Sequence, residues 1–214
     1  MKTSLIILIA AFIFSSCKKQ DSNPVTSAST QETVTDYFPL QIGDYWIYQV
    51  YTADTSLVFT ATNTYDTLRV EQDTLLNGIN YKVFNGGLSI SGLWRDSADY
   101  IVNELGEKLF TINNTSDFLL NEYSQKSDSL FYNTSVVLSY DSACAVPAGN
   151  FAAKYVIGTL TATKPSPTWM MKRNYYYAFS EGVGLIRSRL VYAGGPAYME
   201  ERLIRWHLNT GQTN

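Results

Sequence analysis

Short alternating runs of apolar and polar residues, separated by turn residues, constrain the fold of this chain most strongly. The sequence contains 16 Tyr, 10 Phe and 4 Trp, and aromatic and β-branched residues favour strands over helices. Asn77-Gly78 lies between two alternating runs. Asn-Gly is the strongest short signal for a β-hairpin, because both turn residues take a positive φ. Since no apolar stripe of helical period follows Cys17, we expect an all-β domain.

The strand pattern predicts about ten to twelve strands. They are expected over residues 44–51, 57–64, 67–72, 79–83, 88–91, 100–103, 108–112, 129–140, 153–163, 175–180, 183–191 and 197–206. One short helix is an alternative for residues 116–124. Short links join neighbouring antiparallel strands, whereas parallel pairs need long crossovers. The predicted fold is therefore an antiparallel meander that forms a half-barrel, a barrel or a sandwich.

The amino-terminal segment reads as an export signal. Lys2 is followed by an apolar run from Leu5 to Phe14, which is shorter than the roughly 20 residues that a membrane-spanning helix needs. The residues that follow, Phe14-Ser15-Ser16-Cys17, resemble a bacterial lipobox. The resemblance implies cleavage before Cys17, diacylation of its thiol and acylation of its new amine. Three acyl chains exceed the two signals that stable anchoring takes.

These features divide the chain into four parts. We expect a signal peptide over 1–16, the lipidated cysteine and a disordered tether over 17–35, one β domain over 36–210 and a tail over 211–214. The tether is rich in Ser, Thr, Asn and Gln and cannot offset its ordering entropy. Loss of residues 1–16 lowers the formal charge from −3 to −4. That charge excludes nucleic acid as a natural partner, because no basic surplus is available to neutralise phosphates.

Three segments resemble parts of uncharacterised Bacteroidota lipoproteins. They are YFPLQIGDYWIY at 37–48, VPAGNF at 146–151 and GVGLI at 182–186. The resemblance implies a one-domain envelope lipoprotein, anchored by lipid at the outer membrane on its periplasmic or surface side, and it names no reaction. In physical terms, Pro39 suits a strand entry. Gly182 and Gly184 predict a bulge or a close backbone approach.

Residues for catalysis or metal binding are not evident. The sequence has no His-Glu-x-x-His, no His/Cys metal spacing, no Gly-x-Ser-x-Gly and no phosphate-binding loop. We therefore predict a non-enzymatic protein without cofactor, metal site or catalytic residues. Cys144 is left alone once Cys17 carries lipid, and its small and apolar neighbours predict a buried, inert thiol. Carboxylate pairs such as Asp96 and Asp99 do not indicate a glycosidase site, because any sequence with this many acidic residues contains such pairs.

Five Asp–Ser/Thr pairs resemble the general O-glycosylation sequon of exported Bacteroidota proteins. The candidate acceptors are Thr67, Thr74, Ser97, Ser129 and Ser142. The alternative is that Asp and Ser begin turns, because their side chains bond backbone groups two residues on.

Aromatic and arginine clusters each have two interpretations. Tyr175-Tyr176-Tyr177 with Trp169, and Tyr45-Trp46-Tyr48, either fill the core or face sugars or lipid. A further set, Arg187, Arg189, Arg202 and Arg205, flanks a turn at Gly194-Gly195-Pro196. A hairpin there would place Arg189 opposite Glu200 or Glu201, as a weak surface ion pair. The alternative is an anion-binding patch.

The sequence leaves three functions open. The first is a lipid-anchored domain that binds an apolar or amphiphilic ligand, by analogy with half-barrel carriers. The second is an interaction or structural accessory of an outer-membrane complex, and the third is a glycan-binding surface lipoprotein. Ligand-binding residues stay unassigned, because a one-residue slip in register would reverse every face.

Overall fold

The computed structural model describes residues 32–113, 119–126, 129–165, 168–191 and 197–209, with the side chains of all but 122–141, 164, 165, 168 and 169. The chain divides into two compact units, Met1–Gln31 and Glu32–Asn214, and the described residues belong to the second. Within them, no helix is long and apolar enough to cross a membrane.

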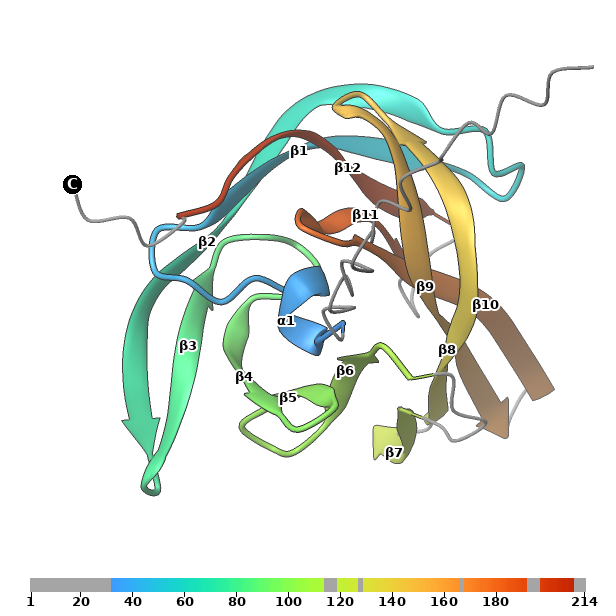
Figure 1. Ribbon diagram of the computed structural model, residues 1–214. Coiled ribbons are helices and arrows are strands. Elements are labelled where there is room, and N and C mark those ends of the chain that lie inside the picture. The colour runs from blue at the N-terminus through green and yellow to red at the C-terminus, as the bar shows by residue number, and fades with distance from the viewer. Residues whose placement is uncertain (1–31, 114–118, 127–128, 166–167, 192–196, 210–214) are drawn as a thin grey trace, which may run out of the picture. The chain divides into compact units, whose positions relative to one another are not determined.

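Twelve strands and one short helix make up this unit (Figure 1). They are α1 (Val34–Tyr37), β1 (Tyr45–Ala53), β2 (Thr60–Leu76), β3 (Ile79–Asn85), β4 (Gly92–Ser97), β5 (Tyr100–Asn103), β6 (Lys108–Thr111), β7 (Leu120–Lys126), β8 (Ser129–Val146), β9 (Gly149–Pro165), β10 (Thr168–Ser180), β11 (Gly184–Val191) and β12 (Tyr198–His207). All pairings are antiparallel and belong to one sheet, in the order β6-β5-β4-β3-β2-β1-β12-β11-β10-β9-β8-β7. The predicted all-β meander is confirmed.

Two meanders meet at the centre of the sheet. Strands β1 to β6 run in order to one edge, β7 to β12 run from the other edge back, and β1 pairs with β12 between them. The edge strands β6 and β7 do not pair with each other in the described chain, so the sheet is open, as in a half-barrel. One connection departs from the meander pattern, because β6 and β7 are consecutive in sequence but lie at opposite edges of the sheet.

The strand boundaries follow the local turn chemistry. Asn77 and Gly78 both take positive φ, 51° and 79°, and Leu76 lies opposite Ile79, which confirms the predicted hairpin. Residues 88–91 form no strand, although their polar–apolar alternation predicts one. The reason is that the backbone N–H of Leu88 donates to a side-chain carboxylate, Glu201 Oε1, over 3.1 Å instead of to a neighbouring strand.

Helical structure occurs in a different place from the predicted one. Residues 120–126 form strand β7, so a helix over 116–124 is wrong for its second half, and 114–118 lie outside the described residues. The helix is instead α1, which includes the last two residues of the predicted tether. Val34 is buried, and this apolar contact orders a segment whose composition reads as a linker.

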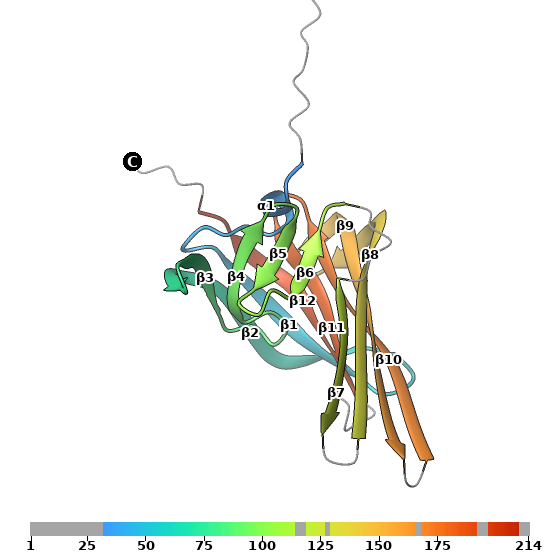
Figure 2. The same ribbon diagram turned by 90° about the horizontal axis from the view of Figure 1, so that it is seen from below.

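The core lies on the concave face of the sheet, around α1 and Phe38, the residue that follows it (Figure 1). The Tyr37 ring lies 5.7 Å from Phe110, and the Phe38 ring lies 5.1 Å from Phe84 and 5.9 Å from Phe179. Phe84 and Phe179 belong to different meanders, so this segment fills the space between them. Figure 2 shows the β7–β8 and β9–β10 hairpins extending past the shorter strands β4 to β6.

Two of the segments that resemble lipoprotein sequences pack against each other. Trp46 Nε1 donates a hydrogen bond to the Val183 carbonyl over 2.6 Å, and Tyr48 Oη donates to the Leu185 carbonyl over 2.9 Å. A Cβ at Gly184 would lie 3.0 Å from Trp46 Nε1 and 3.2 Å from Pro39 Cδ. The close approach predicted at the second glycine is therefore present.

Candidate ligand-binding pocket

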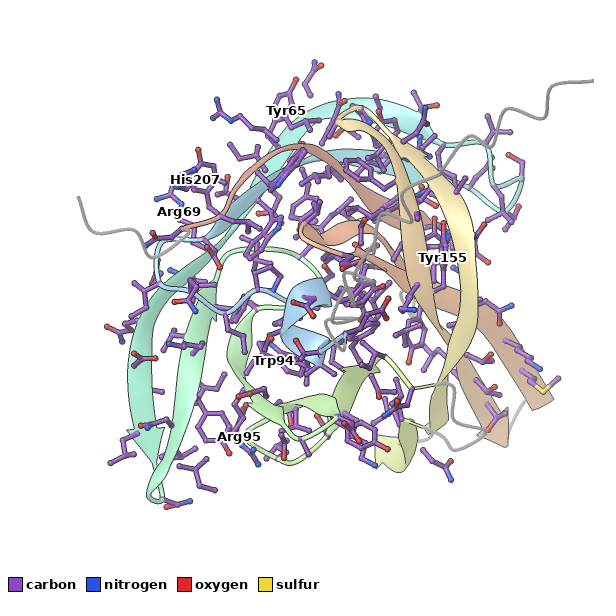
Figure 3. All side chains as sticks on the ribbon, viewed as in Figure 1. Tyr65, Arg69, Trp94, Arg95, Tyr155 and His207 are labelled. Carbon is purple, nitrogen blue, oxygen red and sulfur yellow. The ribbon has the colours of Figure 1, made fainter. Side chains whose placement is uncertain are left out.

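A cavity of about 300 Å³ opens on the concave face, between β9–β11 on one side and the β3–β4 loop with β4 and β6 on the other. Its walls are mainly aliphatic and aromatic. They comprise Ser89, Trp94, Glu107, Lys108, Leu109, Leu120, Val156, Leu160, Tyr175, Tyr177, Leu190 and Val191. Trp94 lies on the α1 side of β4, with its ring 6.4 Å from that of Phe38 (Figure 3). We call this cavity the concave pocket.

Strand periodicity places the side chains on the β9–β10 wall. Val156 lies opposite Tyr177, and Gly158 lies opposite Tyr175. Because Gly158 has no side chain, the Tyr175 ring lies directly over its backbone: a Cβ there would be 1.9 Å from Tyr175 Cζ. The two tyrosine rings meet edge to face at 5.9 Å. Burial raises the pKa of Tyr177 well above its usual range, so its hydroxyl stays neutral.

Polar and apolar groups both line the concave pocket. Trp94 Nε1 donates to the Ile90 carbonyl over 3.0 Å, so its ring offers the pocket an apolar surface. Lys108 Nζ lies 4.0 Å from the Tyr100 ring centroid, which is cation–π distance. The lining combines apolar side chains with Ser89, Glu107 and Lys108, and about 300 Å³ is at the lower end of the volumes of small-molecule sites.

A pair of buried carboxyl groups, Asp66 and Glu201, supports one wall of the pocket. Glu201 is fully buried and accepts hydrogen bonds from Ser89 Oγ over 2.6 Å and Ser188 Oγ over 2.9 Å. Burial, together with a hydrogen bond to Asp66, raises the pKa of Glu201 to about 7. Asp66 Oδ2 is buried and has no hydrogen-bond partner among the described residues. Glu201 therefore fixes the Ser89 segment to β11 and β12 of the sheet.

The sequence reasoning missed this pair. Asp66 and Glu201 lie far apart in the chain, and no spacing rule joins them. One signal was available. Strand residues alternate between the two faces of a sheet, so one of the consecutive glutamates at 200 and 201 has to point to the concave face.

The predicted modification sites lie in separate places. Cys17 is outside the described residues, and Cys144 is buried as predicted. Thr67, Thr74, Ser97 and Ser142 are half-buried, while Ser129 begins β8 and its side chain is not described. The turn interpretation fits Ser97, since Ala98 after it has a φ of 54°. It does not fit Thr67 or Thr74, which lie within β2.

The aromatic residues divide between the two faces. Trp46 and Tyr48 are core residues, as one interpretation predicted, and Tyr175 and Tyr177 line the concave pocket. Tyr176 points to the other face, where its hydroxyl donates to Glu200 over 2.7 Å. Trp46, Trp94 and Trp206 are buried or half-buried, and the Trp169 side chain is not described. The described side chains thus form no solvent-facing row of tryptophans.

The predicted pairing of Arg189 is confirmed, but the predicted surface position of the ion pair is wrong. Arg189 lies opposite Glu200, but Glu200 is fully buried, so this is not a weak surface ion pair. Among the described residues no group of three His, Cys, Asp or Glu side chains could hold a metal ion.

Comparison with models of known protein families finds no match, and comparison with the curated proteins finds none. Two solved structures are similar. A proposed lipoprotein from Parabacteroides distasonis has 11% identity and a TM-score of 0.47, over 83% of this chain and 100% of that chain. A proposed exported protein with a YmcC-like fold from Bacteroides fragilis has 12% identity and a TM-score of 0.38, over 80% and 98%. At these values neither match assigns the chain to a family.

Proposed function

We propose that this chain is a cell-envelope lipoprotein, anchored to the outer membrane through Cys17, whose concave pocket binds an apolar or amphiphilic ligand. The observation that carries the proposal is the pocket itself. Its aliphatic walls, which include Leu160 and Leu190, enclose about 300 Å³ on the inner face of an open sheet. The lipobox resemblance supports the anchor.

The size and chemistry of the pocket limit the ligand. The cavity volume of about 300 Å³ is at the lower end of the range for small-molecule sites. That space suits a short acyl chain or a small ring system rather than a whole diacyl lipid. Lys108 and Glu107 are the charged lining residues, so an amphiphile would place its apolar part against Leu160 and Leu190 and its polar group beside Lys108.

A binding role fits this pocket better than a catalytic one. Among the residues that the structure describes, neither His nor Cys lines it. Glu201, whose raised pKa would suit a general acid, is fully buried and accepts hydrogen bonds from Ser89 and Ser188 rather than lining the cavity. We therefore propose that the protein carries out no reaction of its own.

Native mass spectrometry of residues 18–214, produced in the periplasm of a related host and extracted gently, tests ligand binding. We expect an added mass that leaves on denaturation. Leu160→Trp should abolish this added mass, because the larger ring fills the pocket. Met170→Trp is the matched control, since Met170 is 70% exposed on β10. A wild-type protein without added mass, or an added mass that Leu160→Trp retains, would contradict the proposal.

The anchor is tested separately by Cys17→Ser in the full chain. The variant should leave the membrane fraction, while the wild-type protein should stay with membranes through carbonate washing. A variant that remains in the washed membranes would contradict the lipoprotein interpretation and would leave the proposal of ligand binding in the concave pocket unchanged.

A second function, that of a protein-interaction module, is favoured by the tip of the β2–β3 hairpin. Leu75, Leu76 and Ile79 there are 67%, 38% and 43% exposed, and adjoining exposed apolar side chains mark interaction sites. A photo-crosslinker at Leu75 should then capture one defined envelope protein, and a crosslinker at exposed Tyr65 should not. Equal capture at both positions would argue against it.

A further inference from the structure

Three arginines surround one glutamate on the face of the sheet opposite the concave pocket. We call Arg187, Arg189, Arg202 and Glu200 the arginine cluster. Its members alternate along β11 and β12 with Ser188 and Glu201, which face the concave side. The Nη2 nitrogens of Arg187, Arg189 and Arg202 lie 2.6, 2.8 and 2.8 Å from Glu200 carboxylate oxygens. Figure 1 shows β11 and β12 near the middle of the sheet.

The charges in this cluster do not balance. Glu200 is fully buried and carries one negative charge against three guanidinium groups. Burial alone would raise the pKa of Glu200, but the Tyr176 hydrogen bond and the Arg187 charge outweigh it, so the pKa lies below its usual value. The carboxylate is therefore ionised, and the cluster keeps a surplus of two positive charges.

The surplus charge has hydrogen-bond donors that no acceptor in the described part of the chain uses. A guanidinium carries five N–H donors, and the Nε and Nη2 nitrogens of these arginines bind Glu200. No described acceptor is bonded to their Nη1 nitrogens. None of these nitrogens is a buried atom without a partner. The three side chains are 21–23% exposed. Solvent therefore reaches donors that a second anion could use.

Aromatic rings hold the guanidinium groups in place. Arg202 Cζ lies 4.0 Å from the Tyr51 ring centroid, and Arg189 Cζ lies 4.9 Å from that of Phe59. Cation–π contacts of this kind, together with the shared carboxylate, fix the arginine rotamers before any ligand arrives. A pre-organised site loses little side-chain entropy on binding.

We propose that the arginine cluster is a binding site for a phosphate-like tetrahedral oxyanion, either free or borne by a lipid headgroup. Arginine forks match phosphate oxygens in bidentate geometry. The buried carboxylate of Glu200 pre-positions the three forks, and the remaining two positive charges attract the anion. This site is separate from the concave pocket and does not depend on a ligand there.

Calorimetric titration of residues 18–214 with inorganic phosphate tests the site at constant ionic strength. We expect saturable binding that Arg189→Gln weakens at least tenfold. Arg69→Gln, an exposed arginine on β2 (Figure 3), should leave binding unchanged. Co-sedimentation with phosphatidylglycerol–phosphatidylcholine vesicles forms the second arm. If the protein binds vesicles but not free phosphate, and Arg189→Gln removes this binding, the anion is a lipid headgroup. The proposal is overturned if the protein binds in neither arm, or if Arg189→Gln leaves binding intact.

Glu200→Gln keeps the test decisive if Arg189→Gln does not fold. Removing the buried negative charge leaves three guanidinium groups, so phosphate should raise the melting temperature of this variant more than that of the wild type, relative to chloride at the same ionic strength. An equal rise in both proteins would show that the cluster is closed to anions and purely structural.

Discussion

Glu200 and Glu201 are consecutive in β12, both are fully buried, and their carboxyl groups lie on opposite faces of the sheet. Glu200 is ionised and is held by three arginines. Glu201 has a raised pKa, because burial disfavours its charged form. A one-residue slip of β12 would move each side chain into the other environment. The two glutamates therefore fix the register of a central strand.

Glu201→Gln should change how stability depends on pH. The folded-state pKa of Glu201, about 7, lies above its ordinary value of 4.5, so the native state binds more protons than the unfolded state between these values. The stability that Glu201 contributes is fully present below pH 4.5 and is lost as the pH rises through about 7. Between pH 5 and 8 the wild-type free energy of unfolding should fall about 2 kcal/mol more than that of the variant.

Urea unfolding across this pH range measures the difference. Glu104→Gln, at an exposed position between β5 and β6, serves as the control and should follow the wild-type curve. Parallel curves for wild type and Glu201→Gln would mean that Glu201 is ionised in the native state at pH 5.

Gly184→Ala should destabilise the protein more than Gly182→Ala. Both glycines have positive φ, +101° and +66°, but only at Gly184 would a Cβ crowd other atoms, at 3.0 Å from Trp46 Nε1 and 3.2 Å from Pro39 Cδ. We expect a loss of about 3 kcal/mol for Gly184→Ala and about 1 kcal/mol for Gly182→Ala. Equal losses in urea unfolding would show that backbone conformation, and not the contact with Trp46, requires glycine.

Cys144 should resist thiol reagents in the native protein. It is buried in β8, and it is the one cysteine of residues 18–214. A disulfide reagent should react at least about 100-fold more slowly in buffer than in guanidinium chloride, because modification has to wait for the strand to open. Similar rates in both solvents would contradict the buried position.

The Asp–Ser/Thr sites remain a prediction that intact mass can test. Protein purified from its natural host should carry hexose-type increments. Replacing Thr67, Thr74, Ser97, Ser129 and Ser142 with Ala should remove them. Replacing Ser56 and Thr163, which no Asp directly precedes, should not. A native mass equal to polypeptide plus lipid would exclude glycosylation.

Features set by neighbouring residues could be predicted from the sequence. The Asn77-Gly78 hairpin follows from the φ values that both residues accept. The pairing of Arg189 with Glu200 follows from the length of one connecting turn. The Gly184 contact was expected as a close approach, although its partners, Trp46 and Pro39, were not.

Features set by distant residues could not be predicted. The alternation at residues 88–91 reads as a strand, but the Glu201 carboxylate binds the Leu88 backbone and keeps that segment irregular. The concave pocket combines β4, β6 and β9–β11, which lie in different meanders. Its lining depends on which face each strand presents, and no short-range pattern determines how the two meanders are joined.

The pairing of β1 with β12 also decides when the fold can be completed. Tyr45 at the start of β1 lies opposite His207 at the end of β12, so the two meanders can pair at the middle of the sheet only after β12 has been synthesised. Until β12 is made, β1 and β11 both present unpaired edges, which are templates for aggregation. A nascent chain stopped before Tyr198 would lack β12, the strand that joins the two meanders into one hydrogen-bonded sheet.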